Sequence, residues 1–430
     1  MDIILFWNAV AMRAIRTDYT TDTEAIDPGP DVQQPGPTHT SHAMAMVHIG
    51  MFNAFSTGPT WQGFASAPAG MTVETRRVAV SKAARDLLVD RYSAQAATFD
   101  AEYVTALAQI GRNADVAAGE ERGAAAAAAV LAARVGDGSN APDGGYAQQP
   151  EVYKHDESRG NFGFAWGNVL PFCVANVTTH LPGVPWNPAQ YAIDHAEVRV
   201  KGSVATPAHN RNPVETEIGL FWAYDGARNI GVPPLLYNQV VRAIVATKGD
   251  VTEETNARLF AVVNVALADA GIQCWAEKYH FRLWRPDLGI TNPGNHALPT
   301  PSDPNWRAFG APTTNQRDRP AGTPPFPAYP SGHATFGAAS LRAAELVLAL
   351  PEGFTFDFTS DELDGVAVDT PPRPDVAVTH RLTIDTAIRE NLESRVFLGV
   401  HWRLDGIEGD RNGRVVGELV AANFPARIQA

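Results

Sequence analysis

Cysteine and positive charge are both scarce in this chain of 430 residues. The 2 cysteines, Cys173 and Cys274, lie far apart and outside any CxxC pattern, which excludes a disulfide framework and a thiolate zinc site. We expect two buried free thiols. With 34 Lys and Arg against 47 Asp and Glu, the formal net charge is −13, which argues against a general nucleic-acid-binding surface. This balance still permits one local cationic pocket.

A long uninterrupted apolar run is missing as well. The most conspicuous one, at residues 124–133, is ten residues long and too short to span a bilayer. The first residues carry Asp2 ahead of their apolar run and no basic segment, so they do not resemble a signal peptide. We therefore expect a soluble protein that binds no membrane and no nucleic acid, either cytoplasmic or exported by another route.

Most apolar residues that are present follow a helical spacing. Alternation typical of strands is scarce, and residues 196–204 are the best candidate for a short ribbon. Thr252 is a suitable N-cap for one helix, and Gly271 a suitable stop. The chain is therefore expected to be all-α, with helices at residues 73–110, 120–135, 234–247, 252–270, 334–350 and 383–398.

Long connections rich in Pro, Gly and Asn interrupt these helices, at residues 26–38, 136–149, 180–188 and 291–329. The last one exceeds the usual loop length and lies between two of the motifs below, so we favour a functional role for it. The turn-rich stretch 206–213 suggests a boundary near residue 210. This gives an N-terminal domain of residues 1–210 and a C-terminal domain of residues 211–430, which carries the motifs.

The first motif that carries chemistry is EKYHFRLWRP, residues 277–286. Lys278 and Arg285 are seven residues apart, so on a helix they would share one face two turns apart, and Pro286 would then end that helix. Two long cations on one face can approach one anion from two sides. For this motif alone, a solvated basic face is an equally good interpretation.

The second motif, residues 327–336, leads from two prolines through Ser331, Gly332 and His333 into an apolar helix. With Ser331 as N-cap, the free backbone N–H groups of the helix start form an anion site. Gly332 lets the backbone approach closely, and His333 is a titratable group at the edge of that site. An ordinary capped helix gives no reason for Gly332 and His333.

The third motif, residues 394–405, contains Arg395, His401 and Asp405. Arg395 and His401 are six residues apart, which is not one face of a helix, so we expect Gly399 to turn the chain between them. Asp405 follows His401 by four and can orient its ring through a hydrogen bond. Taken alone, a buried histidine beside an ion pair is the better interpretation of this motif.

Together the motifs supply three cations and two histidines, which suits a tetrahedral or trigonal-bipyramidal oxyanion. Arginine offers bidentate forks and lysine a point charge. Each charge-assisted hydrogen bond contributes roughly 1.5–3 kcal/mol. Phosphate and vanadate would bind equally well on these grounds. The residues alone therefore predict an oxyanion site with two histidines.

The three motifs resemble the signature shared by vanadium-dependent haloperoxidases and type 2 phosphatidic acid phosphatases: Lys-x6-Arg-Pro, Pro-Ser-Gly-His and Ser-Arg-x5-His-x3-Asp. All fixed positions match, in order, between about residues 275 and 405. The stretch FWAYDG at residues 221–226 resembles the soluble haloperoxidase branch. The resemblance implies two packed four-helix bundles, with every vanadate ligand in the C-terminal one.

Within this superfamily, the string at residues 324–337 is similar to that of fungal chloroperoxidases. The positions of Trp275 and Phe326 shape the halide pocket of that branch, where an apolar wall would favour a weakly hydrated halide. Without the resemblance, packing in an aromatic core explains both residues as well. Algal bromoperoxidases usually carry His at the position of Phe326, and the lipid phosphatases are embedded in membranes.

The resemblance also implies one vanadate per chain and a role for each motif residue. His401 would bond the vanadium through a ring nitrogen and be held by Asp405. His333 would be the acid–base group for incoming hydrogen peroxide, which Lys278 would then polarise. The groups around the equatorial oxygens would be Lys278, Arg285, Arg395, the Ser331 hydroxyl and the Gly332 N–H, with Asp225 paired to one of the arginines.

The implied activity is the oxidation of bromide or chloride by hydrogen peroxide to hypohalous acid, at a vanadate that keeps its oxidation state. A small organic acceptor, phosphate as a competing anion and a homodimer complete this expectation. The alternative is a soluble acid phosphatase, in which His333 protonates the leaving group and His401 becomes a phosphohistidine. A non-enzymatic anion-binding protein is a third class, but such a protein does not need His333.

Two other stretches receive plainer interpretations. His39, His42 and His48 lie close together, but their spacing gives no helical face shared by all three, which disfavours a metal site. The acidic, glycine-rich residues 405–413 lack the alternating ligands of a calcium loop and are expected to form a turn.

Overall fold

In the computed structural model the chain is mostly helical, which confirms the all-α prediction. The structure describes residues 1–20, 32–145, 160–175, 188–204, 210–226, 229–292, 302–310, 323–365 and 377–429. Parts of the expected long connections, at residues 26–31, 146–149, 180–187, 293–301 and 311–322, lie outside these ranges, as do residues 205–209 beside the expected domain boundary. The division at residue 210 stays a prediction. Both cysteines are free and buried, as expected.

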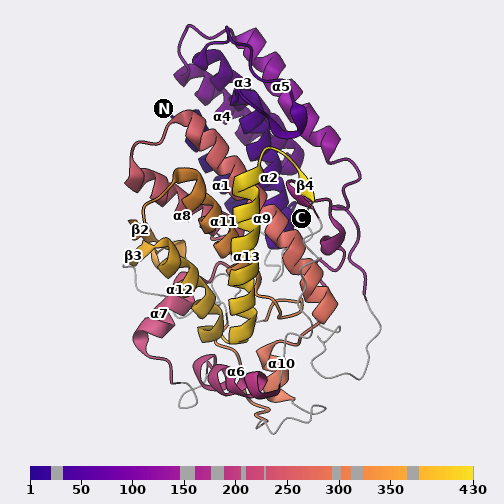
Figure 1. The fold of residues 1–430 in the computed structure, drawn as a ribbon, viewed down its shortest axis with the longest axis vertical. Coiled ribbons are helices and arrows are strands. Elements are labelled where there is room, and N and C mark those ends of the chain that lie inside the picture. The colour runs from indigo at the N-terminus through magenta and orange to yellow at the C-terminus, as the bar shows by residue number, and fades with distance from the viewer. Residues whose placement is uncertain are drawn as a thin grey trace.

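The helices are arranged along one long axis. Figure 1 shows α3, α4 and α5 gathered at one end of the molecule, and α6 and α10 at the other. Their bounds are α1 (Ile3–Asp18), α2 (Gly36–Phe55), α3 (Val73–Arg91), α4 (Ala96–Gln109), α5 (Val116–Ala133), α6 (Pro188–Lys201), α7 (Pro213–Phe221), α8 (Pro233–Lys248), α9 (Glu253–Phe281), α10 (Pro286–Thr291), α11 (Gly332–Leu348), α12 (Ile384–Phe397) and α13 (Arg403–Asn423).

Four of the expected helices correspond to α5, α8, α11 and α12, within a few residues at each end. The helix expected at residues 73–110 is two helices, α3 and α4. The chain leaves the helical conformation at Tyr92 (φ −130°, ψ 59°) and then passes through a short 3-10 turn at Ser93–Gln95. The break lets α4 fold back against α3.

Strands are short in the described part of the chain. β1 (Val174–Ala175) pairs in parallel with β4 (Ile428–Gln429), and β2 (Thr355–Thr359) pairs antiparallel with β3 (Thr379–Thr383). The ribbon expected at residues 196–204 is wrong. Most of that stretch belongs to α6, whose buried Tyr191, His195 and Val198 recur at helical spacing, while Ser203 forms an isolated bridge with Ala308.

α9 is the central helix of the fold and packs against α2, α11 and α13. It is long and apolar enough to cross a membrane, yet 94 % of its most apolar window is buried inside the molecule, as in the core helix of a globular protein. Thr252 caps it as predicted. Gly271 as a stop is wrong, because α9 continues to Phe281. A Cβ at Gly271 would lie 2.9 Å from the ring of Phe336, so the lack of a side chain here lets α11 pack closely against α9.

A glycine repeat brings α13 against α11. The turn expected at residues 405–413 is wrong, because these residues belong to α13. Gly409, Gly413 and Gly417 recur every fourth residue on one face of this helix. A Cβ at Gly413 would lie 2.4 Å from the carbonyl oxygen of Thr335, so the two helices touch backbone to backbone. At the N-terminal ends of both helices, the N–H of Ser331 donates to the carbonyl oxygen of Asp405 at 2.9 Å. The packing therefore joins the second and third motifs.

Candidate functional site

The three motifs meet at one end of α9, where their charged side chains are buried. Lys278 lies in the last turn of α9, Ser331 is the N-cap of α11, Arg395 lies in the last turn of α12, and His401 precedes α13. None of Lys278, Arg285, His333, Arg395 and His401 is more than 7 % exposed. Burying charge is costly, so each of these charged groups needs contacts that compensate its loss of hydration.

The expected placement of Lys278 and Arg285 on one helical face is wrong. α9 ends at Phe281, because Arg282 takes a left-handed conformation (φ 55°). Pro286 does not stop a helix but opens the next one, α10, for which Arg285 is the N-cap. Proline suits that first position, since its N–H would have no partner there. Arg285 thus reaches the site from the N-cap of a second helix, and not from the helix that carries Lys278.

Lys278 is held by the backbone that leads into Ser331. Its ammonium donates to the carbonyl oxygens of Pro327, Ala328 and Pro330 at 3.0, 3.1 and 2.5 Å. All three of its N–H donors are thereby in use. Burial lowers the pKa of Lys278 to about 7. The lysine therefore fixes the loop before α11.

His401 is held from both sides of its ring. Nδ1 lies 3.0 Å from Asp405 Oδ2, and Nε2 lies 2.9 Å from Arg285 Nη1. A guanidinium can only donate, so Nε2 must accept, and the ring proton is on Nδ1 facing the carboxylate. Burial, with the cations Arg285 and Lys278 nearby, holds the pKa of His401 well below its usual range. The ring is therefore neutral, with a lone pair on Nε2.

Asp405 ties this ring to the start of α13. Its Oδ2 also accepts from the N–H of Trp402 at 2.9 Å, which caps the helix. Burial raises the pKa of Asp405 to about 8, although the Trp402 N–H and the charges of Lys278 and Arg285 oppose that rise. The chain turns at Gly399, whose φ of 72° is left-handed, and this turn places His401 just before α13.

Arg395 and His333 both contact the segment that follows α7, where they share one acceptor, the carbonyl oxygen of Ala223. Arg395 Nη2 donates to both oxygens of Asp225, at 3.0 and 2.8 Å, and Nη1 donates to the carbonyl oxygen of Ala223 at 3.2 Å. His333 Nε2 lies 2.7 Å from the same Ala223 oxygen, so Nε2 carries a proton. Burial, with the positive charge of Arg395, lowers the pKa of His333 to about 3.

Some polar atoms at the centre of the site have no hydrogen-bond partner within the described residues. They include Arg285 Nη2 and Arg395 Nε, both buried. An unsatisfied buried donor costs about 1–3 kcal/mol, and more when it is charged. A Cβ at Gly332, the first residue of α11, would lie 3.4 Å from the ring of Trp275. Two unused guanidinium donors beside a helix start fit a small oxyanion.

The comparison with known proteins agrees with this geometry. Residues 258–430 match the family described as "VCPO second helical-bundle domain". The chain is also 40 % identical, over 263 residues, to the vanadium chloroperoxidase of Curvularia inaequalis. Residues 258–430, which carry all three motifs, are thus similar to the second helical-bundle domain that this family model describes. The aligned stretch is 52 % of this chain and 42 % of that relative, so the match spans less than half of the relative's length.

Solved haloperoxidase structures share the fold over almost the whole chain. A bacterial vanadium-dependent iodoperoxidase has a TM-score of 0.69 at 17 % identity and covers 97 % of this chain and 95 % of its own. A holo-type bacterial vanadium-dependent chloroperoxidase has a TM-score of 0.66 at 16 % identity and covers 95 % and 96 %. The similarity thus extends the haloperoxidase fold to the N-terminal half.

Three aromatic rings next to the motifs form what we call the aromatic wall: Trp275, Phe326 and Phe162. The Trp275 and Phe326 ring centroids are 4.9 Å apart, and the Lys278 ammonium lies 5.5 and 5.1 Å from them. Phe162, from the N-terminal half, adds a third ring 6.2 Å from Phe326, and its carbonyl oxygen accepts from Trp275 Nε1 at 3.2 Å. Sequence reasoning missed Phe162, which stands outside every motif.

Sequence reasoning also missed the groups that hold the backbone of His333. The carbonyl oxygen of His333 accepts from the Tyr237 hydroxyl and from Asn391 Nδ2, each at 2.8 Å. Tyr237 and Asn391 also hydrogen-bond to each other at 3.0 Å. The shared carbonyl of Ala223 was missed as well, since a backbone acceptor has no signature in the sequence.

The three N-terminal histidines of α2 face separate partners. His39 Nδ1 contacts the carbonyl oxygen of Pro35 at 3.1 Å, His42 Nε2 lies 2.7 Å from Asp137 Oδ2, and His48 Nδ1 contacts that of Met44 at 2.7 Å. Within the described ranges, no group of three or more His, Cys, Asp or Glu is placed to hold a metal ion.

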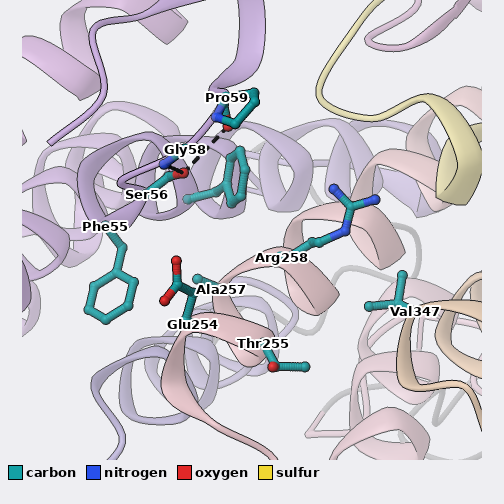
Figure 2. A pocket seen from close by; sticks show the side chains of 10 residues that line it. Phe55, Ser56, Gly58, Pro59, Glu254, Thr255, Ala257, Arg258 and Val347 are labelled. Atoms are coloured by element: carbon teal, nitrogen blue, oxygen red, sulfur yellow. Dashed lines mark hydrogen bonds between the residues drawn. The ribbon is translucent and has the colours of Figure 1, made fainter.

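A hollow of about 340 Å³ lies at the opposite end of α9 (Figure 2). Phe55, Glu254, Arg258 and Val347 are among the residues that line it, and none belongs to the motifs. The Arg258 guanidinium donates to the carbonyl oxygens of Ala421 and Phe424, so it anchors the end of α13. At 1.5 Å per residue, roughly 30 Å of helix separates this hollow from Lys278. The hollow is therefore separate from the site at the motifs.

Proposed function

We propose that the protein is a vanadium-dependent haloperoxidase that oxidises halide with hydrogen peroxide to hypohalous acid. The observation that carries this proposal is the state of His401. Its Nε2 is unprotonated and contacts Arg285, and the buried guanidinium groups of Arg285 and Arg395 each keep an unused donor. A neutral imidazole nitrogen is a metal ligand, and the free donors suit the oxygens of an oxyanion.

The residues present fit vanadate. His401 would ligate the metal through Nε2, with Asp405 fixing the ring from the other side. Arg285 and Arg395 would bind oxygens with their unused donors. When bound, vanadate supplies a Lewis acid that activates hydrogen peroxide without a change of oxidation state. The remaining contacts would come from Lys278, the Ser331 hydroxyl, the Gly332 N–H and His333.

His333 takes the proton of incoming hydrogen peroxide in this proposal. Its Nε2–H is engaged by Ala223, so Nδ1 is the nitrogen that accepts. The low pKa of His333 keeps the ring neutral at working pH. A bound anion favours the charged form and raises that pKa, which makes His333 a better base when the site is filled.

Lys278 must exchange partners to act on the activated oxygen. Its ammonium is fully engaged by three backbone carbonyls, so a donor has to leave one of them. A pKa near 7 means that little free energy separates its charged and neutral forms. Lys278 would thus both organise the loop at residues 327–330 and polarise the reacting oxygen.

The aromatic wall is proposed as the side from which the halide enters. Trp275 and Phe326 would contact a weakly hydrated ion, bromide or chloride, and the hypohalous acid would pass to a small organic acceptor. The relative's name as a chloroperoxidase supports this choice. Phosphate is expected to compete for the oxyanion site. A homodimer, and a C-terminal domain at residues 211–430 that holds the site, complete the proposal.

Halogenation assays on vanadate-free and vanadate-loaded protein test this function. Monochlorodimedone halogenation is followed with hydrogen peroxide and chloride, bromide or iodide, and hydrolysis of an aryl phosphate is measured on the same samples. We expect vanadate to switch on halogenation and to suppress any phosphate hydrolysis. Protein that hydrolyses the phosphate ester and halogenates nothing after loading would support the phosphatase instead.

A further inference from the structure

The segment at residues 221–225 presents one peptide group to the site. The carbonyl of the peptide between Ala223 and Tyr224 accepts from His333 Nε2 at 2.7 Å and from Arg395 Nη1 at 3.2 Å. Because a trans peptide is planar, its N–H points the opposite way, out of the site. Whatever holds that N–H sets the direction of the carbonyl.

Glu362 holds it. Its Oε1 accepts from the N–H of Tyr224 at 2.9 Å, and its side chain is buried at 1 % exposure. Glu362 lies in the 3-10 turn Asp361–Leu363, between β2 and β3. Neither the motifs nor the aromatic wall includes it. A carboxylate on one end of this peptide and a histidine on the other form a short chain of polarised hydrogen bonds.

The rest of the turn holds the same segment in an unusual conformation. Tyr224 has a φ of 37°, which residues other than glycine rarely adopt. Its hydroxyl accepts from the N–H of Asp361 at 2.8 Å, and Ser360 Oγ donates to the carbonyl oxygen of Phe221 at 2.6 Å. External contacts must maintain such a conformation, and here they come from residues 360–362.

We propose that Glu362 is a positioning residue for the reaction, acting through the Ala223–Tyr224 peptide. It keeps the Ala223 carbonyl aimed at His333 and Arg395. This orientation holds the ring proton of His333 on Nε2, leaves Nδ1 as the proton acceptor, and turns the Arg395 guanidinium so that Nε faces the oxyanion. The consequence for turnover rests on the proposed function, whereas the effect on His333 and on anion binding does not.

Two variants of Glu362 distinguish a positioning role from a contribution to stability alone. Glu362→Gln keeps an oxygen that accepts from Tyr224, and Glu362→Leu removes it. Asp18→Leu is the matched control, since Asp18 is also buried and accepts the N–H groups of Gln33 and Gln34, away from the site. The readouts are the melting temperature, the dissociation constant for inorganic phosphate by calorimetry, and the pH profile of bromide oxidation by vanadate-loaded protein.

We expect Glu362→Leu to weaken phosphate binding about tenfold, as the loss of a supporting partner typically does. It should also shift the pH profile of bromide oxidation. The phosphate dissociation constant of Glu362→Gln should stay within about twofold of the wild-type value. Asp18→Leu should lower the melting temperature without changing phosphate affinity. Unchanged phosphate affinity in Glu362→Leu, or equal losses in both Glu362 variants, would overturn the proposal.

A measurement on the wild type needs no variant to fold. The ring ¹⁵N chemical shifts of His333 should report a proton on Nε2 and none on Nδ1. The opposite tautomer overturns the proposal. A protein that shows the expected tautomer and phosphate affinities, yet oxidises no halide when loaded with vanadate, would refute the proposed function and leave the role of Glu362 standing.

Discussion

Arg285 Nη1 lies 2.9 Å from His401 Nε2, and 2.8 Å from the carbonyl oxygen of Val400. The arginine thus contacts the same nitrogen that would bond vanadium in the proposed function. Its other terminal nitrogen, Nη2, has no partner within the described residues. Arg285 is therefore placed to keep His401 deprotonated at Nε2 and to bind an oxyanion with the same planar group.

Replacing this arginine by lysine should expose the difference between the two cations. Arg285→Lys keeps the charge but cannot contact Val400, His401 and an anion together. We expect the dissociation constant for phosphate or vanadate to rise about tenfold or more, measured by calorimetry. Arg282→Lys, at the end of α9, is the control and should stay within about twofold. Equal affinities in Arg285→Lys and wild type would contradict this reading of the site.

His333 should matter for turnover and much less for binding. Its ring contacts Ala223, and other groups provide the ligand nitrogen and the guanidinium donors. We expect His333→Ala to bind vanadate within a few-fold of the wild type, and to lose about 10²–10⁴ in kcat for bromide oxidation, the usual worth of a general base. A variant that loses binding and turnover in equal measure would assign His333 to the binding of the anion.

The glycine repeat of α13 offers a test of packing. A methyl group at Gly413 would lie 2.4 Å from the Thr335 carbonyl oxygen and push α13 away from α11. We expect Gly413→Ala to lower the free energy of unfolding by about 1–3 kcal/mol, measured by urea denaturation. Val415→Ala, on the exposed side of the same helix, is the control and should cost less than about 0.5 kcal/mol. Equal stabilities of the two variants would refute the close contact.

His48 predicts a dependence of stability on pH that is unrelated to the site. It is buried, its Nδ1–H donates to Met44, its Nε2 accepts from Asn8, and burial lowers its pKa to about 4. Between pH 6.5 and 4 the unfolded chain therefore takes up a proton that the folded chain refuses. Stability falls as the pH falls through this window, by about 2 kcal/mol at pH 5 from this group.

Urea denaturation of wild type and His48→Gln at pH 7.5 and pH 5 measures this contribution. The variant lacks the titrating ring, so its loss of stability between the two pH values should be smaller by about 2 kcal/mol. A packing defect that does not depend on pH affects the variant equally at both pH values, so it cancels when the loss of stability between them is compared. An identical pH dependence in both would show that His48 is not held neutral.

The sequence predicted those parts of the site that lie close together along the chain. Ser331 caps α11, Asp405 faces His401 four residues away, and Gly399 makes the turn before it. Side chains of fixed spacing and a glycine turn are local properties. The resemblance added Asp225, which the structure places on Arg395 across a large gap in sequence.

The parts that failed depend on contacts between distant segments. Gly271 suits a helix end by its type, but the ring of Phe336 explains it, and α11 is far away in the sequence. Arg285 leaves the helix of Lys278 because Arg282 adopts a left-handed conformation, which its residue type does not favour. Glu362 acts on a peptide N–H, and the identity of Tyr224 says nothing about it.

The measurement that tests the account most directly follows bound vanadium and bromide oxidation together, in wild type and His401→Ala. Both proteins are dialysed against vanadate, and the metal content and the rate are determined on the same samples. We expect about one vanadium per wild-type chain, with activity proportional to the bound metal, and neither metal nor activity in His401→Ala. Full bromide oxidation by reconstituted His401→Ala would contradict the assignment of His401 as the ligand.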